Sequence, residues 1–561
     1  MKTRQQAFDQ IKDGSFDLCV IGGGASGASC ALDAQLRGLR TVVVDAGDFA
    51  SGSSTASTKM AHGGVRYLQE AVNDLDIGQY HLVESALRER LGMLHSAPHL
   101  TRTVEFLVPC FSNFEKVYYG LGMKMYEWIS GKSSLLPSRI LSREEALYRM
   151  PAMQHEKLVG AVAYADGQFD DARYGLALVE TFEAAGGVAL NYARAAGFGK
   201  DEAGKITSAT VSDRMGHGTL EIRARAFVNA TGPFSDIVRQ LASPGAAPRM
   251  RPSKGVHIMV PLDGFPDQDA VLIPKTEDGR VIFAIPWNGR LLIGTTDTGY
   301  TPGEEMVVKQ EEIQYLLRQI NPYLNSPLTA DKVVAGYAGV RPLVAAAGVT
   351  DTKKLIRDDE VEFDAGTGLV SILGGKWTTH RLMGEETIDR VQDYLGARSP
   401  SRTWNYLLAG AHGYSEDYWQ TLVNDYSVPA GLAKYLAHKY GTAAAQVLEL
   451  TRADRYLAAP LVTGEAPIRA QVVYAARVEM AITIEDVLAR RIGFQLYSWR
   501  GAIEAAPIVA ELLRRELGWS GEEEGRALET YIAGVNHMIS MAGQMPEPGP
   551  LAERELVLER K

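Results

Sequence analysis

The sequence contains little cysteine and no long apolar run. Only three of its 561 residues are cysteines, Cys19, Cys30 and Cys110. Three cysteines exclude a disulfide scaffold and a cysteine-held iron cluster, and they are typical of a reducing compartment. No stretch reaches the roughly 20 apolar residues of a transmembrane helix, and the N-terminus lacks an apolar signal core. We therefore expect a cytoplasmic protein, with peripheral contact at the inner face of the cell membrane left open.

An excess of positive charge is absent too. Lys and Arg number 58 against 68 Asp and Glu, for a net charge of −10 at pH 7. A general nucleic-acid binder needs a surplus of cations to neutralise phosphates, so we expect no nucleic-acid partner. Metal motifs are missing as well, because there is no pair of nearby cysteines and Pro98 separates His95 from His99. We predict no metal site.

Glycine, by contrast, is abundant, with 56 residues against a usual share of about 7%. Its strongest pattern is GGGASG at 22–27, which fits G-x-G-x-x-G. An apolar run at 16–21 precedes it, a small-residue helix is expected from 28 to 37, and a second apolar strand at 41–44 follows. This order predicts a βαβ dinucleotide-binding unit.

Each residue of that pattern has a physical role. Gly22 provides the tight turn, Gly24 lets backbone approach a pyrophosphate, and Gly27 lets helix and strand pack. Asp45, at the end of the second strand, can accept hydrogen bonds from ribose hydroxyls. The alternative is a tight turn that binds no ligand.

The fingerprint alone does not distinguish FAD from NAD. Two later features favour FAD: the α/β pattern resumes twice after other segments, and glycine-rich strand ends occur at 230–232 and 374–376. They predict a cofactor domain assembled from separated segments around a long ligand. The alternative for each glycine pair is an ordinary turn.

The rest of the chain divides by pattern. Helical spacing dominates from about 86 to 160, and 251–335 indicates strands and hairpins, with Asn288-Gly289 as a strong hairpin signal. After a linker at 398–402 the chain is mostly helical to about 540. Within it, Thr483 and Asp486 form a near-capping box, and Asp486 and Arg490 are an i,i+4 pair.

Two groups of polar residues are candidates for substrate chemistry. The run 57–67 (STKMAHGGVRY) can line a cleft, and its Arg66 suits a phosphate or carboxylate. The second group is His257, Arg341 and Arg357, which lie beside glycine, proline or apolar strands. A protein of net negative charge must concentrate cations locally to bind an anion. The alternative for each is a structural residue or a surface ion pair.

One segment is a candidate for a membrane surface. From 114 to 139, aromatic and apolar residues alternate with basic ones, which is typical of an amphipathic helix that docks on an anionic bilayer. A core helix with solvated lysines is the alternative.

With these motifs together, the sequence resembles the FAD-dependent glycerol-3-phosphate dehydrogenases. The likeness rests on runs between about 16 and 495: the fingerprint through Asp45, GDFASG at 47–52, STK and HGGVRYL within 57–68, NATGP at 229–233, SKGVH at 253–257, IGTTD at 293–297, GVRPL at 339–343, GGKWTT at 374–379, and EMA and DVLARR within 479–491.

The resemblance implies an α/β fold with three parts. They are a discontinuous FAD-binding Rossmann-like domain of the glutathione-reductase and D-amino-acid-oxidase type (1–85, 161–250 and 336–397), a strand-rich substrate cap (86–160 and 251–335), and an all-helical C-terminal domain (404–545) with a tail (546–561).

It further implies hydride transfer from sn-glycerol 3-phosphate to FAD, which yields dihydroxyacetone phosphate, with electrons passed to a membrane quinone. By motif match, the substrate-site positions are Arg66, Tyr67, His257, Arg341, Arg357 and Lys376. The match at Arg357 is looser, because an acidic run follows it. We assign to the cofactor Gly22, Gly24, Gly27, Asp45, Ser57, Thr58, Gly232, Gly375 and Thr378.

Within this set we assign roles. His257 is our first choice of general base and His62 the second. Arg341, Arg66 and Arg357 are expected at the phosphate, with Lys376 near the flavin or a substrate oxygen. Four alternatives stay open: an oxygen-using glycerol-phosphate oxidase, an amino-acid oxidase of the same fold, an NAD-linked dehydrogenase and a non-enzymatic nucleotide-binding scaffold. The sequence leaves the oligomeric state open, a homodimer included.

Overall fold

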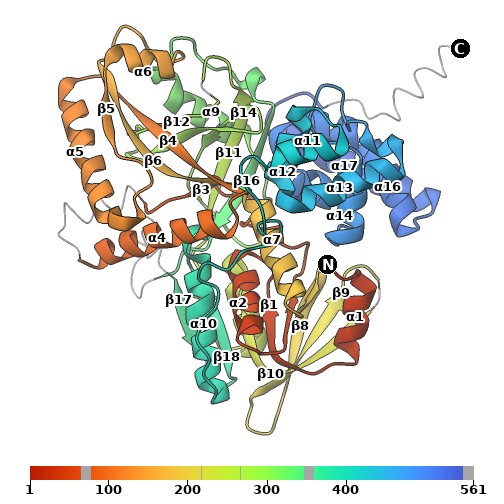
Figure 1. Cartoon of the computed structure of the whole chain (residues 1–561). Helices are drawn as coiled ribbons and strands as arrows, with labels where there is room; N and C mark the ends of the chain where they lie inside the picture. The colour runs from red at the N-terminus through yellow and green to blue at the C-terminus, as the bar shows by residue number, and fades with distance from the viewer. Residues whose placement is uncertain (65–76, 217, 266, 346–358, 547–561) are drawn as a thin grey trace, which may run out of the picture.

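The computed structural model describes residues 1–64, 77–216, 218–265, 267–345 and 359–546, which form three units (Figure 1). An eight-stranded sheet with helices on its faces lies at one end, and a ten-stranded sheet lies at the other. A bundle of C-terminal helices packs beside both. The predicted α/β unit, strand-rich unit and helical unit are all present.

The eight-stranded sheet is parallel at its centre, in the order β17-β18-β10-β1-β2-β7, and β8 and β9 extend antiparallel from β10. Its strands are β1 Phe16–Ile21, β2 Thr41–Val44, β7 Val188–Leu190, β8 Ala193–Lys200, β9 Ile206–Asp213, β10 Thr219–Asn229, β17 Glu360–Phe363 and β18 Leu369–Leu373. The bounds of β1 and β2 match the prediction, because helices cover both faces of these strands and their residues are apolar apart from Asp17 and Thr41 near the strand starts.

Five helices from separate parts of the described chain pack on this sheet. They are α1 Arg4–Lys12, α2 Ala25–Leu36, α7 Asp171–Ala184, α8 Ser235–Ala242 and α10 His380–Leu395. Helix α2 begins three residues earlier than predicted, because Gly24 takes the extended N-cap conformation and Ala25 already enters the helix. Helix α10 begins at His380, after a short 3-10 turn at Trp377–Thr379.

The ten-stranded sheet is mainly antiparallel, in the order β15-β11-β14-β13-β12-β4-β6-β3, with β16 on β11 and β5 on β6. Its strands are β3 Met60–Ala61, β4 Thr101–Cys110, β5 Arg139–Leu141, β6 Gly160–Phe169, β11 Ser253–Pro261, β12 Ala270–Ile273, β13 Ile282–Trp287, β14 Arg290–Gly294, β15 Thr298–Gly299 and β16 Ala335–Arg341. The predicted hairpin joins β13 and β14, and both turn residues have positive φ, +47° at Asn288 and +71° at Gly289.

Two features of this sheet differ from expectation. The helical spacing expected from 86 to 160 is wrong at β4, because Thr101–Cys110 is a strand with partners on both sides. The predicted boundaries assign 161–169 and 336–341 to the nucleotide domain, whereas β6 and β16 pair within the ten-stranded sheet. The remaining helices of this unit are α4 Ile77–Ser96, α5 Asn113–Ser130, α6 Arg143–Arg149 and α9 Gln310–Ile320.

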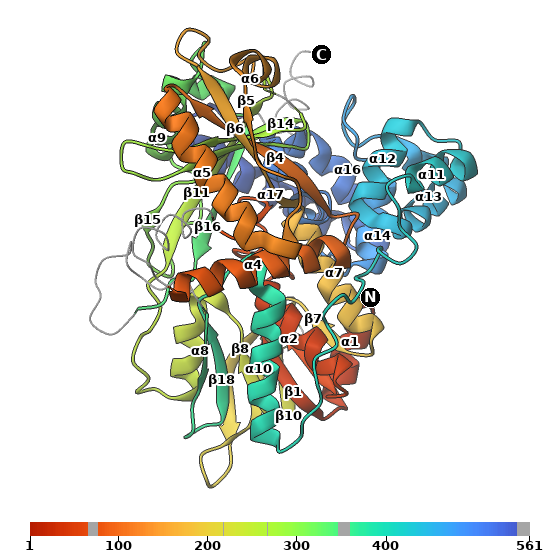
Figure 2. The same cartoon turned by 60° about the vertical axis from the view of Figure 1, so that its left-hand side comes forward.

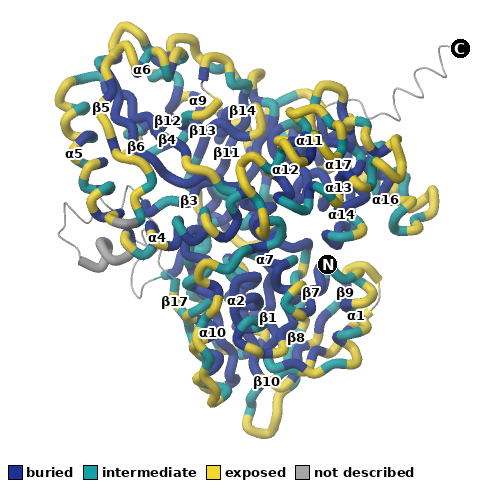
Figure 3. The backbone as a smooth tube through the Cα atoms, viewed as in Figure 1, coloured by how far each residue is buried: buried dark blue, intermediate teal, exposed yellow. Residues whose placement is uncertain are grey.

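The C-terminal helices share a core with the ten-stranded sheet. They are α11 Tyr418–Tyr426, α12 Ala430–Tyr440, α13 Ala444–Ala453, α14 Ala470–Val478, a π-helical turn at Asp486–Arg491, α15 Phe494–Tyr497, α16 Trp499–Leu517 and α17 Gly521–Met541. Their buried apolar residues form one continuous cluster with those of the ten-stranded sheet, and the eight-stranded sheet has a second cluster (Figure 3). Within the described residues, no helix combines the length and hydropathy needed to cross a membrane.

Candidate active site

The glycine-rich turn between β1 and α2 requires glycine at two positions. Gly22 has a φ of +106°, and a Cβ there would lie 2.5 Å from the carbonyl oxygen of Ala230, directly after β10. A Cβ on Gly27 would lie 1.8 Å from the carbonyl oxygen of Gly22. Gly24 is the N-cap of α2, so the N–H groups of the first helical turn lie beside it, and that of Ala25 donates to the hydroxyl of Ser54 (2.9 Å). The turn therefore provides a backbone site for an anion such as a pyrophosphate.

Asp45 completes this site at the end of β2. Its carboxylate accepts hydrogen bonds from the backbone N–H of Gly23 (2.6 Å) and of Gly47 (2.8 Å). Burial raises the pKa of Asp45 to about 6, although both hydrogen bonds act in the opposite direction. At neutral pH the side chain is therefore an acceptor, as recognition of ribose hydroxyls requires.

A cavity of about 1320 Å³ opens beside the turn. It exceeds the roughly 300–1,000 Å³ of common ligand pockets, so a long cofactor and a substrate have room together. The predicted residues that line it are Gly22, Gly24, Asp45, Ser57, Thr58, His62, Gly232, His257, Arg341, Gly375, Lys376 and Thr378. Gly27 does not line it and serves packing. Arg66, Tyr67 and Arg357 lie outside the described residues.

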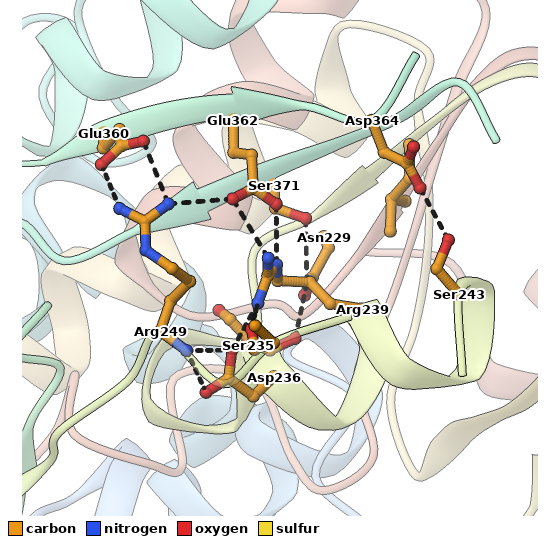
Figure 4. A network of polar contacts seen from close by, with 12 residues as sticks. Asn229, Ser235, Asp236, Arg239, Ser243, Arg249, Glu360, Glu362, Asp364 and Ser371 are labelled. Atoms are coloured by element: carbon orange, nitrogen blue, oxygen red, sulfur yellow. Dashed lines mark hydrogen bonds and ion pairs between the residues drawn. The ribbon is translucent and has the colours of Figure 1, made fainter. Parts of the chain in front are cut away.

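The turn that contains Gly232 is bound to a polar network, because the hydroxyl of Ser235 donates to the carbonyl oxygen of Gly232 (2.7 Å). Figure 4 shows this network around Asn229 and Ser235. The side-chain amide of Asn229 donates to the carbonyl oxygen of Ser235 (2.9 Å) and to the hydroxyl of Ser371 (3.3 Å). These bonds join the end of β10, the start of α8 and β18 at the turn that contains Gly232. Ion pairs extend the network outward, Arg239–Glu362 and Arg249–Glu360.

His257, on β11, lies at the polar end of the cavity. Its Nε2 is 2.9 Å from the hydroxyl of Thr58, and its ring stacks on Tyr337 at 5.1 Å between centroids. Its Nδ1 is buried and has no hydrogen-bond partner among the described residues. Burial, followed by the positive charges of Arg341 and Lys59, lowers the pKa of His257 well below its usual value of 6.5. The ring is therefore neutral and can accept a proton.

The loop that carries Thr58 is fixed by a buried ion pair. The carboxylate of Asp171, at the start of α7, accepts hydrogen bonds from the hydroxyl of Ser57 (2.7 Å) and from Lys59 Nζ (2.5 Å). The Lys59 ammonium lies 4.9 Å from the ring centroids of both Trp287 and Tyr337. These contacts fix the backbone on either side of Thr58 and so hold its hydroxyl against His257.

Arg341, at the end of β16, is the cation of the polar end. Its Nη2 donates to the hydroxyl of Thr295 and to the carbonyl oxygen of Thr296, both at 3.1 Å, and Nη1 lies 3.4 Å from Asp297. About a quarter of its side chain is exposed. A Cβ on Gly255 would lie 2.7 Å from this guanidinium, which would then have to move away from its present position. The guanidinium can therefore bind an anion in the cavity.

His62 also lines the cavity. Its backbone N–H donates to the hydroxyl of Thr378 (3.2 Å), which joins its loop to the start of α10. Burial lowers the pKa of His62; Asp166 opposes this shift, and Lys376 and Arg90 add to it.

A buried network supports the same loop from α5. The backbone N–H of Gly63 donates to the hydroxyl of Tyr126 (2.9 Å), which in turn donates to Asp166 (3.0 Å). Arg90 neutralises that carboxylate at 2.6 Å. Helix α5 is thereby coupled to the loop beside His62.

The other end of the cavity is apolar. It runs between α5 and the β12–β13 strands, and its apolar lining includes Tyr118, Leu121, Met123, Met125, Leu272 and Phe283. Helix α5 lies on the outside of the ten-stranded sheet, away from the C-terminal helices (Figures 1 and 2). Its outer face is unusually apolar for a surface: Phe114 is 78% exposed, Trp128 77% and Leu121 65%. Because Leu121 belongs to both, the exposed face is continuous with the cavity.

Three residues of the site were not among the sequence predictions. Asp171 and Tyr126 form hydrogen bonds with loops that precede them by more than sixty positions. Asp297 contacts Arg341. The one available signal was the pair of acidic residues at 170–171 ahead of an apolar helix, which also reads as an ordinary helix start. The described residues contain no group of three or more His, Cys, Asp or Glu placed to hold a metal ion.

Two family models match different parts of the chain. Residues 17–390 match the FAD dependent oxidoreductase family, and residues 401–524 match the C-terminal domain of alpha-glycerophosphate oxidase. Curated relatives include a probable mitochondrial glycerol-3-phosphate dehydrogenase of Caenorhabditis elegans, 39% identical over 94% of this chain and 74% of the worm protein. The mitochondrial glycerol-3-phosphate dehydrogenase of Mus musculus is 38% identical over 92% of this chain and 72% of its own length.

Solved structures agree with the sequence relatives. The glycerol-3-phosphate dehydrogenase of Bacillus halodurans, complexed with FAD, superposes with a TM-score of 0.77 at 30% identity, over 95% of this chain and 97% of that one. The FAD-bound L-alpha-glycerophosphate oxidase of Mycoplasma pneumoniae superposes with a TM-score of 0.52 at 15% identity, over 70% of this chain and 98% of its own. The second likeness concerns the fold alone.

Proposed function

The chain belongs to the FAD-dependent glycerol-3-phosphate dehydrogenase family, and from that premise we propose that it oxidises sn-glycerol 3-phosphate to dihydroxyacetone phosphate. The predictions of this family and of FAD are confirmed, which removes the NAD-linked and scaffold alternatives. The observation that carries the proposal is the convergence of the dinucleotide turn, a neutral histidine and an arginine on one cavity.

The cofactor is expected along the glycine-rich side of the cavity. Gly22 and Gly24 would face the pyrophosphate, Asp45 a ribose, and Gly232 and Gly375 leave room for the ring system. The residues fit the group, because Gly22, Gly24 and Asp45 line the cavity, and the close backbone turn there requires glycine, since a Cβ on Gly22 would lie 2.5 Å from the carbonyl oxygen of Ala230. When bound, FAD supplies the two-electron acceptor for the hydrogen of the substrate C2.

Arg341 is the residue that we assign to the substrate phosphate. A guanidinium forms paired hydrogen bonds with phosphate oxygens, and the hydroxyl of Thr295 accepts a hydrogen bond from Arg341 and so helps to orient it. The roles of Arg66 and Arg357 at the same phosphate stay predictions, and Lys376 is proposed at a substrate oxygen or the flavin.

His257 is the residue that we assign to the C2 hydroxyl proton. It is neutral before the substrate binds, and it is one of the residues that line the cavity. A phosphate dianion beside Arg341 counters the charge that lowers the pKa of His257, so substrate binding increases the basicity of the ring. His62 is the second candidate for this role.

The direct test is anaerobic mixing of the holoenzyme with glycerol 3-phosphate. We expect loss of the visible flavin absorbance, a much slower loss with glycerol, and none with glycine or sarcosine. Reduction by an amino acid but not by glycerol 3-phosphate would assign the enzyme to the amino-acid oxidases of this fold. Failure of the protein to take up FAD would contradict the proposal as a whole.

For the second half-reaction we propose a membrane quinone as the electron acceptor. The apolar end of the cavity, between α5 and the β12–β13 strands, suits a flat apolar molecule, and it is continuous with the exposed face of α5. After anaerobic reduction, a soluble quinone analogue should reoxidise the flavin faster than oxygen does, with little peroxide formed. Rapid reoxidation by oxygen with one peroxide per substrate would instead make the enzyme an oxidase.

We also propose that α5 rests on a lipid bilayer. Phe114, Val117, Leu121 and Trp128 recur every three to four residues or multiples of that spacing and so share one exposed side of the helix. Lys124 is paired with Glu127 at 2.8 Å, so the apolar side chains rather than net charge would provide most of the binding.

Flotation with phospholipid vesicles tests this placement. The chain should float with neutral vesicles nearly as well as with anionic ones, and the double variant Phe114→Ser/Trp128→Ser should remain at the bottom of the gradient while its flavin is still reduced by glycerol 3-phosphate. If the wild-type chain does not float and sediments as a homodimer that the double variant dissociates, this face is an interface between two copies instead.

A further inference from the structure

A buried cluster of four charged side chains joins the C-terminal helical unit to the nucleotide-binding unit. Asp48 follows β2, and its carboxylate binds Arg490 Nε (2.6 Å) and both terminal nitrogens of Arg491, one of them at 3.0 Å. Arg490 also binds Asp486 at 2.5 Å. Side-chain exposure is between 0% and 6% throughout the cluster, and its two arginines balance its two aspartates.

Such a cluster is poorly explained by stability alone. Transfer of four charges out of water opposes folding, and apolar residues of similar size often stabilise a protein as well or better. Charged pairs instead fix the relative position of the groups they join, because a guanidinium binds a carboxylate in only a few geometries. The cluster is therefore expected to hold a particular part of the molecule in place.

The part it fixes is the loop that lines the nucleotide end of the cavity. Asp48 is three residues beyond Asp45 and one beyond Gly47. The N–H of Gly47 donates to the Asp45 carboxylate, and the carbonyl oxygen of Gly47 accepts a hydrogen bond from the N–H of Tyr192 (2.7 Å). Asp45 and Gly47 line the cavity, whereas Asp48 does not.

The segment hydrogen-bonded beside this loop is connected to the same cluster. The hydroxyl of Tyr192 donates to Asp486 (2.6 Å), and the side-chain amide of Asn191 donates to Asp48 (3.1 Å). Directly after them, residues 193–195 line the cavity. Both of these neighbouring segments are therefore hydrogen-bonded to a π-helical turn that is more than 290 positions away in the chain.

We propose that the C-terminal helical unit positions the FAD-binding loop, through Arg490 and Arg491 on Asp48, and thereby sets the affinity for FAD. These are positioning residues, since none of them lines the cavity. The inference rests on FAD binding as part of the proposed function. It gives the C-terminal unit a role in cofactor binding although that unit contributes no residue to the cofactor side of the site.

The test compares two variants that each neutralise one carboxylate at the boundary between these units. Asp48→Asn keeps the shape of the side chain and removes its charge. The matched control is Glu479→Gln, because the Glu479 side chain forms a buried ion pair with Arg173 across the same boundary (2.6 Å) and has no hydrogen bond to the loop 45–48. Arg491 binds only the backbone carbonyl of Glu479 (2.6 Å), which the substitution keeps. The readouts are the FAD dissociation constant, from titration of the apoprotein with FAD, and the unfolding midpoint of the apoprotein.

Asp48→Asn should raise the FAD dissociation constant on the order of tenfold, the size of coupling usual within one buried network, and Glu479→Gln should leave it unchanged. Both should lower the unfolding midpoint. Arg491→Lys keeps the charge but loses the paired geometry, so it should raise the constant by less, and it serves if Asp48→Asn does not fold.

An equal rise in both variants would reduce the cluster to general domain docking and overturn the proposal, as would an unchanged constant in Asp48→Asn or, where that variant does not fold, in Arg491→Lys. A wild-type chain that fails to bind FAD, or binds it without reduction by glycerol 3-phosphate, would contradict the proposed function instead. The two failures are therefore distinguishable.

Discussion

The two ends of the cavity are built in opposite ways. The polar end has Arg341, His257 and Thr58, each held by directional contacts with its neighbours. The other end, along α5, has Leu121 and other apolar side chains and opens toward an exposed surface. Directional bonds discriminate between small polar substrates, whereas apolar packing accepts any flat molecule of suitable size. Substitutions at the polar end should therefore affect the substrate half-reaction, and those along α5 the acceptor half-reaction.

The largest effect is expected from His257→Asn. Loss of a general base lowers kcat by about 10²–10⁴-fold, and the KM for glycerol 3-phosphate should change little because the phosphate site is intact. The rate of anaerobic flavin reduction measures this step directly. His62→Asn is the control, with a smaller loss; a greater loss in His62→Asn would transfer the role of the base to His62.

Arg341→Ala should have the next largest effect. Loss of charge-assisted hydrogen bonds to phosphate should raise the KM for glycerol 3-phosphate about 100-fold, while FAD remains bound. Arg341→Lys should fall in between, because it keeps the charge without the paired geometry.

Glycerol is the control substrate for Arg341→Ala, because it has no phosphate group for Arg341 to bind. Its weak turnover should be similar in the wild type and in Arg341→Ala. An unchanged KM for glycerol 3-phosphate in Arg341→Ala would remove this residue from the phosphate site.

At the apolar end the expected effect is smaller. Leu121→Asn should raise the KM for a quinone analogue about tenfold, because part of an apolar contact is lost, without slowing flavin reduction by the substrate. Val117→Asn is matched to it, since Val117 is 66% exposed on the same helix and does not line the cavity. If both substitutions raise the KM equally, the acceptor binds the outer face and not the cavity.

The smallest expected effect is on pH dependence. The pKa of His257 is well below 6.5, so the base stays neutral and kcat/KM should be constant from about pH 8 down to about pH 6.5. Arg341→Ala removes one of the charges that lower this pKa, so the acidic limb of the profile should move to higher pH.

The same depressed pKa has a consequence for stability. Below about pH 6.5, His257 is protonated in the unfolded chain but stays neutral in the folded one. The free energy of unfolding should therefore fall by about 1.4 kcal/mol for each pH unit that the pH is lowered, from this group alone. Urea unfolding of the wild type and of His257→Asn over this range measures the difference. Identical slopes would show that His257 is not protonated on unfolding.

Local patterns predicted the parts of the fold that depend on neighbours in the chain. The bounds of β1 and β2 and the Asn288-Gly289 turn follow from apolar runs and turn residues. The capping contact of Thr483 with Asp486 is also present, at 3.0 Å. That Arg490 reaches Asp48 as well as Asp486 could not be predicted, because 442 positions separate the two residues.

The candidate site shows the same division. Its motif residues were found individually from glycine spacing and from the family resemblance, and the described ones other than Gly27 line one cavity. The supports were not found, because a buried contact such as that between Asp171 and Ser57 leaves no periodic signal in either segment. For the same reason β6 and β16 were placed on the wrong side of the predicted boundaries.

The two apolar cores have a consequence for how the chain is made. The core of the eight-stranded sheet draws on strands from Phe16 to Leu373, and the other core is completed by residues such as Trp499 and Val535. A ribosome releases these segments from first to last, so β1 is exposed long before β18 can pair with β10. Neither core can close on a partial chain, and the nascent polypeptide must keep its strands apart from other chains through most of its synthesis.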